Sequence, residues 1–258
     1  MNDKNISNRV YLSTVAGDAA PVAAEYGLGL ELAEFCTASN MDADFNEWDA
    51  VAREKMKSAD RLVLHAAFNE LCPAAIDPLV LDIAKRRYRQ AYELAAGYGI
   101  RRIVAHSGYV PFVYFKQYFV DRSVEFWQEF LSDKPADLTV VLENVLEDEP
   151  FMLIDVVKGV GDPRLRLCLD VGHANITKKD VTMEEWARAV VPYLGHAHLH
   201  NNRGWPDSHD PLFDGDMDLE ALLHILAGGA PDATLTLEIR DSCRSSVEWL
   251  ANKGFLDR

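Results

Sequence analysis

Eight short apolar runs rich in β-branched residues recur along this chain and constrain its fold more than any other feature. They cover residues 10–14, 28–35, 61–67, 102–107, 138–145, 166–172, 195–202 and 233–239. Segments with the apolar spacing of amphipathic helices separate them, as in repeated strand–helix units around a parallel sheet. The runs start about 32 residues apart, close to the length that one such unit requires. The pattern predicts one α/β domain over residues 1–258, a single (β/α)8 TIM barrel.

The segments between the runs support this prediction. Helical spacing predicts helices over residues 77–98, 121–131, 181–190, 219–226 and 245–251. The third of these begins with the T-x-E-E pattern of a capping box, and the fourth ends at Gly228 and Gly229. Residues 108–120 and 201–218 have no regular period and are predicted to be long loops after the fourth and seventh strands.

Charge and cysteine content narrow the class of protein. The net charge is −15, with no basic tract that would attract a phosphate backbone, so we do not expect nucleic acid as a partner. The four cysteines are scattered without a C-x-x-C pair, which disfavours both a disulfide framework and a thiolate zinc site. The chain has no apolar run long enough to span a membrane and begins without a signal-peptide pattern. We expect a cytoplasmic protein without membrane contact, in which any metal is held by nitrogen and oxygen.

One stretch combines His196, His198, His200, Asp207 and His209. On a strand, where side chains alternate between two faces, the first three imidazoles share one face while Ala197 and Leu199 share the other. Imidazole and carboxylate together are the ligand types of zinc, manganese or iron, rather than of calcium or magnesium.

Polar residues also occur at the predicted carboxyl ends of the other strands, where a (β/α)8 barrel places its reactive groups. In chain order, the residues at or just beyond these ends are His65, His106, Glu143, Asp170, His173, His198, Asp207, His209 and Glu238. Alternation points Glu143 to the same side as Val141, and His106 to the same side as Val104. So many carboxylates and imidazoles at one end of a barrel would repel one another or lack partners without cations. The sequence therefore predicts a metal centre.

Four short sequence motifs around these residues resemble those of a known superfamily. LENV, LDVGHAN, HLHNN followed by DSHDPLFDGDMD, and LEI are similar to motifs of the xylose-isomerase-like barrels, which group sugar isomerases and epimerases with apurinic endonuclease IV enzymes. The resemblance implies three ligand groups: His65, His106 and Glu143; His173, Asp207 and His209; and a central group of Glu143, Asp170, His198 and Glu238. It also implies that Glu143 bridges two metals. The strand period leaves His200 as an alternative to His198.

Two enzymatic functions follow from the resemblance. In the first, a divalent metal-dependent sugar or sugar-phosphate isomerase/epimerase, Glu143 and Glu238 are the catalytic acid and base. In the second, a multinuclear-zinc phosphoesterase, the substrate would be a small phosphorylated molecule rather than DNA. A non-enzymatic metal-binding barrel is the third alternative. We expect one to three ions of Zn²⁺ or Mn²⁺, with His200, Arg203 and Trp205 as weaker candidates for contact with a carbohydrate or sugar-phosphate substrate. Formation of a homo-oligomer stays open.

Overall fold

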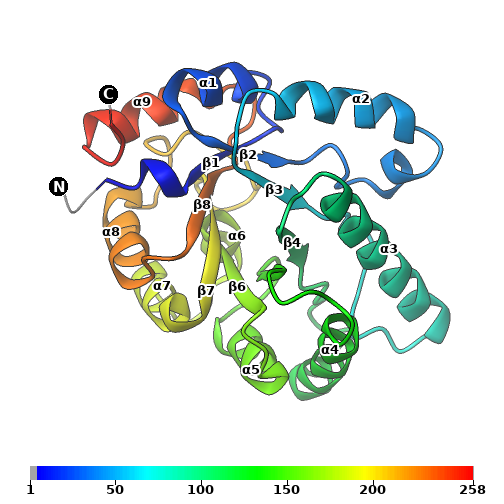
Figure 1. Ribbon diagram of the computed structural model, residues 1–258. Coiled ribbons are helices and arrows are strands. Elements are labelled where there is room, and N and C mark those ends of the chain that lie inside the picture. The colour runs from blue at the N-terminus through cyan, green and yellow to red at the C-terminus, as the bar shows by residue number, and fades with distance from the viewer. Residues whose placement is uncertain (1–4, 258) are drawn as a thin grey trace.

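The computed structural model describes residues 5–257, and its centre is a closed barrel of eight parallel strands (Figure 1). Each strand pairs with the next in the sequence, and β1 closes the barrel against β8. The strands are β1 Val10–Ser13, β2 Gly29–Leu32, β3 Leu62–His65, β4 Arg102–His106, β5 Thr139–Glu143, β6 Leu165–Asp170, β7 Leu194–Leu199 and β8 Thr234–Leu237. Each of the eight predicted runs contains a strand or most of one, and the predicted (β/α)8 barrel is confirmed.

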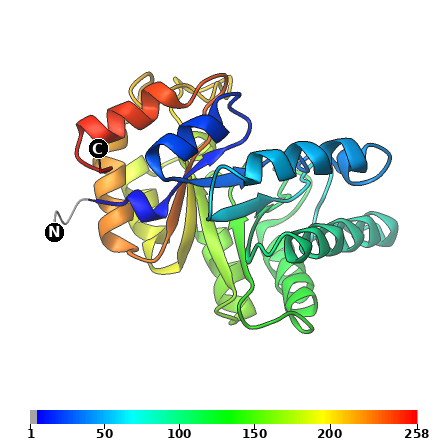
Figure 2. The same cartoon turned by 45° about the horizontal axis from the view of Figure 1, so that its top comes forward.

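Helices surround the barrel, as the tilted view of Figure 2 shows. They are α1 Ala19–Tyr26, α2 Phe45–Met56, α3 Pro78–Gly97, α4 Lys116–Leu131, α5 Phe151–Val160, α6 Val171–Thr177, α7 Met183–Val190, α8 Leu219–Gly229 and α9 Arg244–Asn252. Short 3₁₀ segments cover Ser7–Arg9, Ala38–Met41 and Val191–Tyr193. The helical periods did not single out α1, α2, α5 or α6, and α4 begins at Lys116 instead of residue 121. No helix within residues 5–257 is long and apolar enough to cross a membrane.

The two sides of the strands are packed differently. Outward-facing residues such as Leu30, Leu142 and Leu199 belong to a large apolar core beneath the helices. A smaller separate cluster of Tyr11, Val63, Val104, Val141 and Cys168 fills part of the barrel interior. Buried polar side chains occupy other positions of the barrel interior. They include Glu31 on β2, His196 and His198 on β7, and Thr234 and Thr236 on β8.

A bulge in β7 sets the direction of its histidines. Leu167 pairs with Leu194, but Cys168 pairs with His196, so Gly195 is an extra residue in β7. A one-residue insertion reverses the alternation of the strand. His196 therefore lies beside inward-facing Cys168. A side chain at Gly195 would meet Arg166, with a Cβ only 2.7 Å from Arg166 Cβ.

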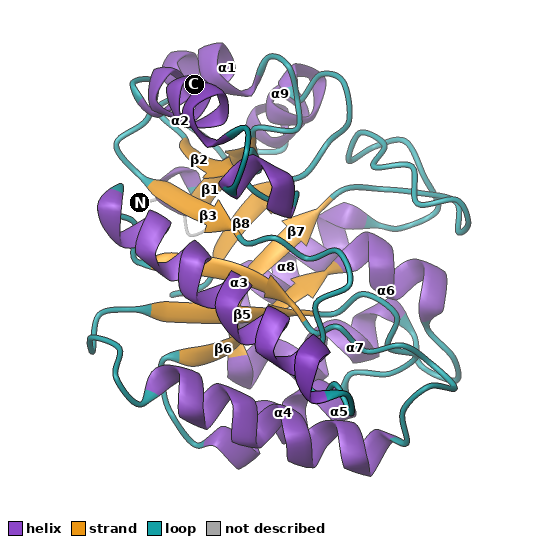
Figure 3. Cartoon of the chain, turned by 90° about the vertical axis from the view of Figure 1, so that its right-hand side faces the viewer, coloured by secondary structure: helices purple, strands orange, loops and turns teal. Residues whose placement is uncertain are grey.

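The parallel strands run in one direction, so their carboxyl ends meet at one end of the barrel (Figure 3). Side chains cap the first turns of two helices, α6 and α7, that begin near this end. Asp170, the last residue of β6, is also the N-cap of α6, where its side chain accepts a hydrogen bond from the backbone N–H of His173 at 2.7 Å. The capping box predicted for α7 is present between Thr182 and Glu185.

Candidate metal centre

The structure brings all nine sequence-predicted ligands together at the carboxyl end of the barrel. Within each of three groups, the potential ligand atoms all lie within 4.8 Å of one another. The groups are the central set of Glu143, Asp170, His198 and Glu238; the paired-histidine set of His65, His106 and Glu143; and the loop set of His173, Asp207 and His209. Glu143 belongs to two of the sets.

Strand pairing places the ligands of the first two sets side by side. His106 is the register partner of Glu143, and Asp170 is the register partner of His198. Glu238 follows directly after β8, and its backbone N–H donates to the carbonyl of Leu199 at 3.2 Å. Because these residues lie at the ends of paired strands, the sheet itself fixes their spacing.

The central set converges on one imidazole nitrogen. His198 Nδ1 lies 3.2 Å from Glu143 Oε1, 3.1 Å from Glu238 Oε2 and 3.7 Å from Asp170 Oδ2. Glu143, Asp170 and His198 are fully buried. A pair of hydrogen bonds between Asn144 and the backbone of Asp170, 2.9 and 3.0 Å long, ties the ends of β5 and β6 together.

In the paired-histidine set, two imidazoles face one carboxylate oxygen. The Nε2 atoms of His65 and His106 each lie 3.3 Å from Glu143 Oε2. His65 Nδ1 lies 2.9 Å from the carbonyl oxygen of Ala66. A carbonyl can only accept, so this contact assigns the proton to Nδ1 and directs the Nε2 lone pair at Glu143.

The loop set repeats this arrangement. The Nε2 atoms of His173 and His209 lie 3.2 and 3.1 Å from Asp207 Oδ2. Their Nδ1 atoms lie 3.0 Å from the carbonyl of Asn144 and 2.8 Å from the carbonyl of Glu238. His209 has a φ of 49°, a left-handed conformation that costs energy in a non-glycine residue and is often found at functional sites.

The loop that carries Asp207 and His209 is fastened at its base by Asn201. Asn201 and Asp210 exchange two backbone hydrogen bonds of 2.9 Å. The Asn201 side-chain amide also donates to the carbonyls of Leu212 and Met217 at 3.0 and 3.1 Å. The positions of Asp207 and His209 are therefore fixed by the backbone as well as by their own side-chain contacts.

The ligand chemistry fits divalent metals such as zinc and manganese. Within residues 5–257, the ion pairs of Glu143, Asp170, Asp207 and Glu238 involve histidines and neither lysine nor arginine. Glu143 Oε2 is buried and has no hydrogen-bond donor among these residues. Imidazole lone pairs that face carboxylates need a shared cation between them, either protons or metal. Buried Cys168 also borders His198 and Glu143, but burial raises the pKa of its thiol well above the usual range, which disfavours it as a ligand.

The pKa shifts in the metal-free protein favour ionised carboxylates and, at several histidines, a bound proton. Burial opposes charge at Glu143, yet the neighbouring His198 holds the pKa of this carboxyl well below its usual range. Burial also opposes the charged form of His209, but Asp207 raises the pKa of His209 to about 9. Burial lowers the pKa of His106 to about 4, so this imidazole is neutral at pH 7. Metal binding would replace the protons on the other imidazoles.

Two buried residues beneath the central set were not assigned to the site from the sequence. Glu31 on β2 is fully buried, and its Oε1 lies 2.9 Å from His198 Nε2. Its Oε2 lies 2.9 Å from Nε2 of His196, which the sequence placed on the same strand face as His198 but left out of the site. The sequence holds a signal for Glu31, because a glutamate between Leu30 and Leu32 in an apolar strand must face the barrel interior when both leucines face outward.

The structure places the three weaker substrate candidates differently from one another. His200 is fully buried, with Nε2 3.1 Å from Asp170 Oδ1, and its ring stacks on His209 at 3.9 Å. A Cβ on Gly172 would lie 1.9 Å from the His200 ring, so the close approach of α6 requires glycine there. Arg203 and Trp205 are exposed on the loop after β7, and Arg203 pairs with Asp214.

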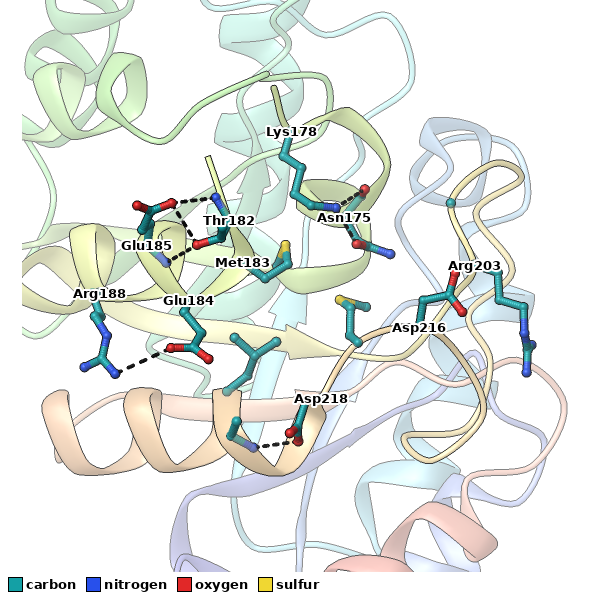
Figure 4. A pocket seen from close by; sticks show the side chains of 14 residues that line it. Asn175, Lys178, Thr182, Met183, Glu184, Glu185, Arg188, Arg203, Asp216 and Asp218 are labelled. Carbon is teal, nitrogen blue, oxygen red and sulfur yellow. Dashed lines mark hydrogen bonds and ion pairs between the residues drawn. The ribbon is translucent and has the colours of Figure 1, made fainter. Parts of the chain in front are cut away.

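A cavity of about 790 Å³ lies beside the loop set, between α6, α7, the loop after β7 and the start of α8 (Figure 4). Lys178, Arg188 and Arg203 line it together with Asp216 and Asp218. The lining does not include the candidate metal ligands, but two hydrogen bonds link the cavity wall to one of them, Asp207. Asn175 donates to Asn202 at 2.7 Å, and Asn202 donates to Asp207 Oδ1 at 3.4 Å.

The profile of the family described as "Xylose isomerase-like TIM barrel" matches residues 22–256. The chain belongs to this family. A relative of this xylose isomerase-like barrel, the uncharacterized protein MJ1311 of Methanocaldococcus jannaschii, is 26% identical over 196 residues, or 71% of this chain and 67% of that protein.

Solved structures share the barrel at low identity. The TTHB071 protein from Thermus thermophilus, soaked with ZnCl2, has a TM-score of 0.75 and 24% identity, covering 96% of this chain and 97% of its own. A D-tagatose 3-epimerase-like protein has a TM-score of 0.75 and 20% identity over 95% and 96% of the two chains. The IOLI protein with a bound zinc atom has a TM-score of 0.72 and 14% identity over 95% and 96%. These likenesses establish the fold of this xylose isomerase-like barrel, and its neighbours include sugar epimerases.

Proposed function

We propose that this protein is a divalent metal-dependent isomerase or epimerase of a sugar or sugar phosphate. The observation that carries the proposal is the central set, in which Glu143 and Glu238 approach His198 Nδ1 from β5 and from the end of β8 at 3.2 and 3.1 Å. Two carboxylates on different strands, beside one metal position, suit the removal and return of a proton at a single carbon. The family and its epimerase neighbours support the same reaction class.

In this proposal Glu143, Asp170, His198 and Glu238 would hold the ion. A divalent ion bound there would chelate neighbouring substrate oxygens and acidify the C–H bond between them. The glutamate that acts as the base, as a carboxylate, takes the proton from that carbon and becomes a carboxylic acid. If the other glutamate has taken up a proton from solvent, it returns that proton to the opposite face of the same carbon, and the configuration inverts. If the first glutamate instead gives its proton to the former carbonyl carbon, and the hydroxyl proton moves to the former carbonyl oxygen, the carbonyl moves to the adjacent carbon.

The protonation state of the glutamates favours this role. Burial would raise the pKa of both carboxyls, but the positive charge of His198 lowers it at Glu143 and Glu238 alike. In the metal-free protein both carboxyls are therefore ionised at neutral pH, so either can act as the base, and the one that acts as the acid must first take up a proton. Asp170 is held by the backbone N–H of His173 and by His200, which leaves it as a fixed ligand.

The test is proton exchange. Protein loaded separately with Zn²⁺ and Mn²⁺ is incubated in D₂O with a panel of ketoses and ketose phosphates, and deuterium incorporation next to the carbonyl is followed by NMR. We expect incorporation with at least one panel member, and loss of it after chelation and in Glu238→Gln. Metal-loaded protein that exchanges no proton in any member of the panel would contradict the proposal.

Metal-assisted phosphoester hydrolysis is the second candidate, because a one-metal isomerase does not require the loop set. Three ligand groups with a shared Glu143 would allow several ions to hold the attacking and leaving oxygens of a phosphoester. Release of inorganic phosphate from sugar phosphates, measured with the same metal-loaded protein, distinguishes the two candidates. Phosphate release without proton exchange would favour the second.

A further inference from the structure

Glu31 is a buried carboxylate that the proposed reaction does not use. It is the third residue of β2, where its register partners are Ser13 on β1 and Val63 on β3, and it is fully buried. A carboxylate without strong partners would cost several kcal/mol in such a position. The partners that Glu31 has therefore indicate why it is there.

Three side chains hold the Glu31 carboxylate. His196 Nε2 and Thr236 Oγ1 lie 2.9 and 2.7 Å from Oε2. On its other ring nitrogen, His196 contacts Thr234, which in turn accepts a hydrogen bond from Arg102. This chain runs from β4 through β8 and β7 to β2 across the barrel interior, so the position of Oε2 is determined by residues on four strands.

The third partner is the metal ligand His198. Glu31 Oε1 lies 2.9 Å from His198 Nε2, an ion-pair distance at an angle outside hydrogen-bond geometry, and neither atom has a hydrogen-bond partner among the described residues. The opposite ring nitrogen, Nδ1, faces Glu143, Glu238 and Asp170. An imidazole that gives the Nδ1 lone pair to a metal must carry its proton on Nε2, and the Glu31 carboxylate is the acceptor group within reach of that proton.

We propose that Glu31 is a positioning residue for the central metal: it fixes the tautomer and ring orientation of His198 and increases the basicity of its Nδ1. A carboxylate behind a histidine ligand typically has these two effects, and its loss lowers metal affinity by about 10- to 100-fold. The proposal rests on the proposed metal-dependent function, but it can fail separately from it.

The experiment compares Glu31→Gln with Glu34→Gln. Glu34 is also a buried carboxylate, lies just beyond the same strand and pairs with Lys55 at 2.7 Å, but it contacts no metal ligand within the described residues. Each protein is freed of metal and titrated with Co²⁺, and with Zn²⁺ in competition with a chelator. The visible absorption of bound Co²⁺ reports the geometry around the ion, which a loss of stability alone would not change.

We expect Glu31→Gln to bind the central metal about 10- to 100-fold more weakly and to change the Co²⁺ spectrum, whereas Glu34→Gln keeps the wild-type affinity and spectrum. Glu31→Asp should recover part of the affinity, because it keeps the charge. If Glu31→Gln does not fold, Thr236→Val removes one donor to Glu31 and should give a smaller loss in the same direction.

Three outcomes overturn the proposal. Folded Glu31→Gln with wild-type affinity and spectrum rejects the role of Glu31 while leaving the metal-dependent function intact. If Glu31→Gln cannot be tested, wild-type affinity and spectrum in Thr236→Val reject it in the same way. Wild-type protein that binds neither Co²⁺ nor Zn²⁺ rejects the role of Glu31 and the metal-dependent function together.

Discussion

The central set and the loop set use the same chemistry on different supports. Glu143, Asp170 and His198 lie at the ends of paired strands and are fully buried. Asp207 and His209 lie in the loop after β7, about one-fifth exposed, with His209 in a left-handed conformation. Sites on strands are held more rigidly than sites on loops. The sheet therefore holds the central set, whereas the hydrogen bonds of Asn201 at the base of the loop have to hold the loop set.

The largest effect should come from the carboxylate that two sets share. We expect Glu143→Gln to lower turnover by about 10²- to 10⁴-fold and to weaken metal binding, because Glu143 is both a ligand and a candidate base. Proton exchange and elemental analysis are the measurements, with Glu34→Gln as the control for loss of a buried carboxylate. A Glu143→Gln protein with near wild-type turnover would remove Glu143 from the mechanism.

Asp207→Ala should break the loop set alone. The wild-type chain should hold more than one ion, and the variant should hold one fewer while the central ion stays, since the two sets share no residue. Elemental analysis of protein prepared without chelator gives the count, and His209→Ala should behave in the same way. One ion per chain in both wild type and variant would refute a second metal site and leave a one-metal enzyme.

The loop set should also give the metal-free protein a pH dependence. Despite burial, Asp207 raises the pKa of His209 to about 9, so this contact stabilises the fold fully below the unfolded value near 6.5 and is lost as pH rises through 9. The lowered pKa of Asp207 acts oppositely: its contribution is present above about 3.9 and is lost in acid.

The melting temperature of chelated protein should therefore fall by a few degrees between pH 6.5 and pH 9. Asp207→Asn should reduce this slope but leave the part due to His198, whose pKa is raised by other carboxylates. Added metal should remove the slope, because metal replaces the protons on these imidazoles. Equal slopes in the wild type and in Asp207→Asn would show that other groups control the pH dependence.

The smallest effect should be at the tip of the loop. Arg203 and its partner Asp214 are more than half exposed, so we expect Arg203→Ala to leave both stability and metal content almost unchanged. If Arg203 contacts substrate, KM should rise while kcat stays constant. Loss of metal in this variant would mean that the loop tip and the ligands are not independent.

The sequence predicted the barrel, and it predicted which side chains converge at one end of it, because both depend on local pattern. Each predicted ligand follows an apolar run, and parallel strands bring such ends together whatever the helices do. The helix α2 was not predicted because Ala52 is its only fully buried residue, so its apolar period is weak. The start of α4 carries the aromatic-rich sequence that was interpreted as a loop, which hid its first turn.

The residues that the sequence did not place depend on pairings between distant strands. Nothing near Glu31 indicates that β7 and β8 supply His196, His198 and Thr236 as its partners. The extra residue Gly195 is visible only in the register of β6 against β7. Such contacts arise when the barrel closes, and a reading of one segment at a time does not reveal them.

The hydrogen bonds around Asn201 affect how new specificities could arise in this scaffold. Asn201 and Asp210 pair the two ends of the segment that carries Asp207 and His209, while Arg203 and Trp205 are exposed at its tip. Insertions or exchanges at the tip would leave these backbone hydrogen bonds in place, so evolution or an engineer could replace the tip without disturbing the candidate metal ligands.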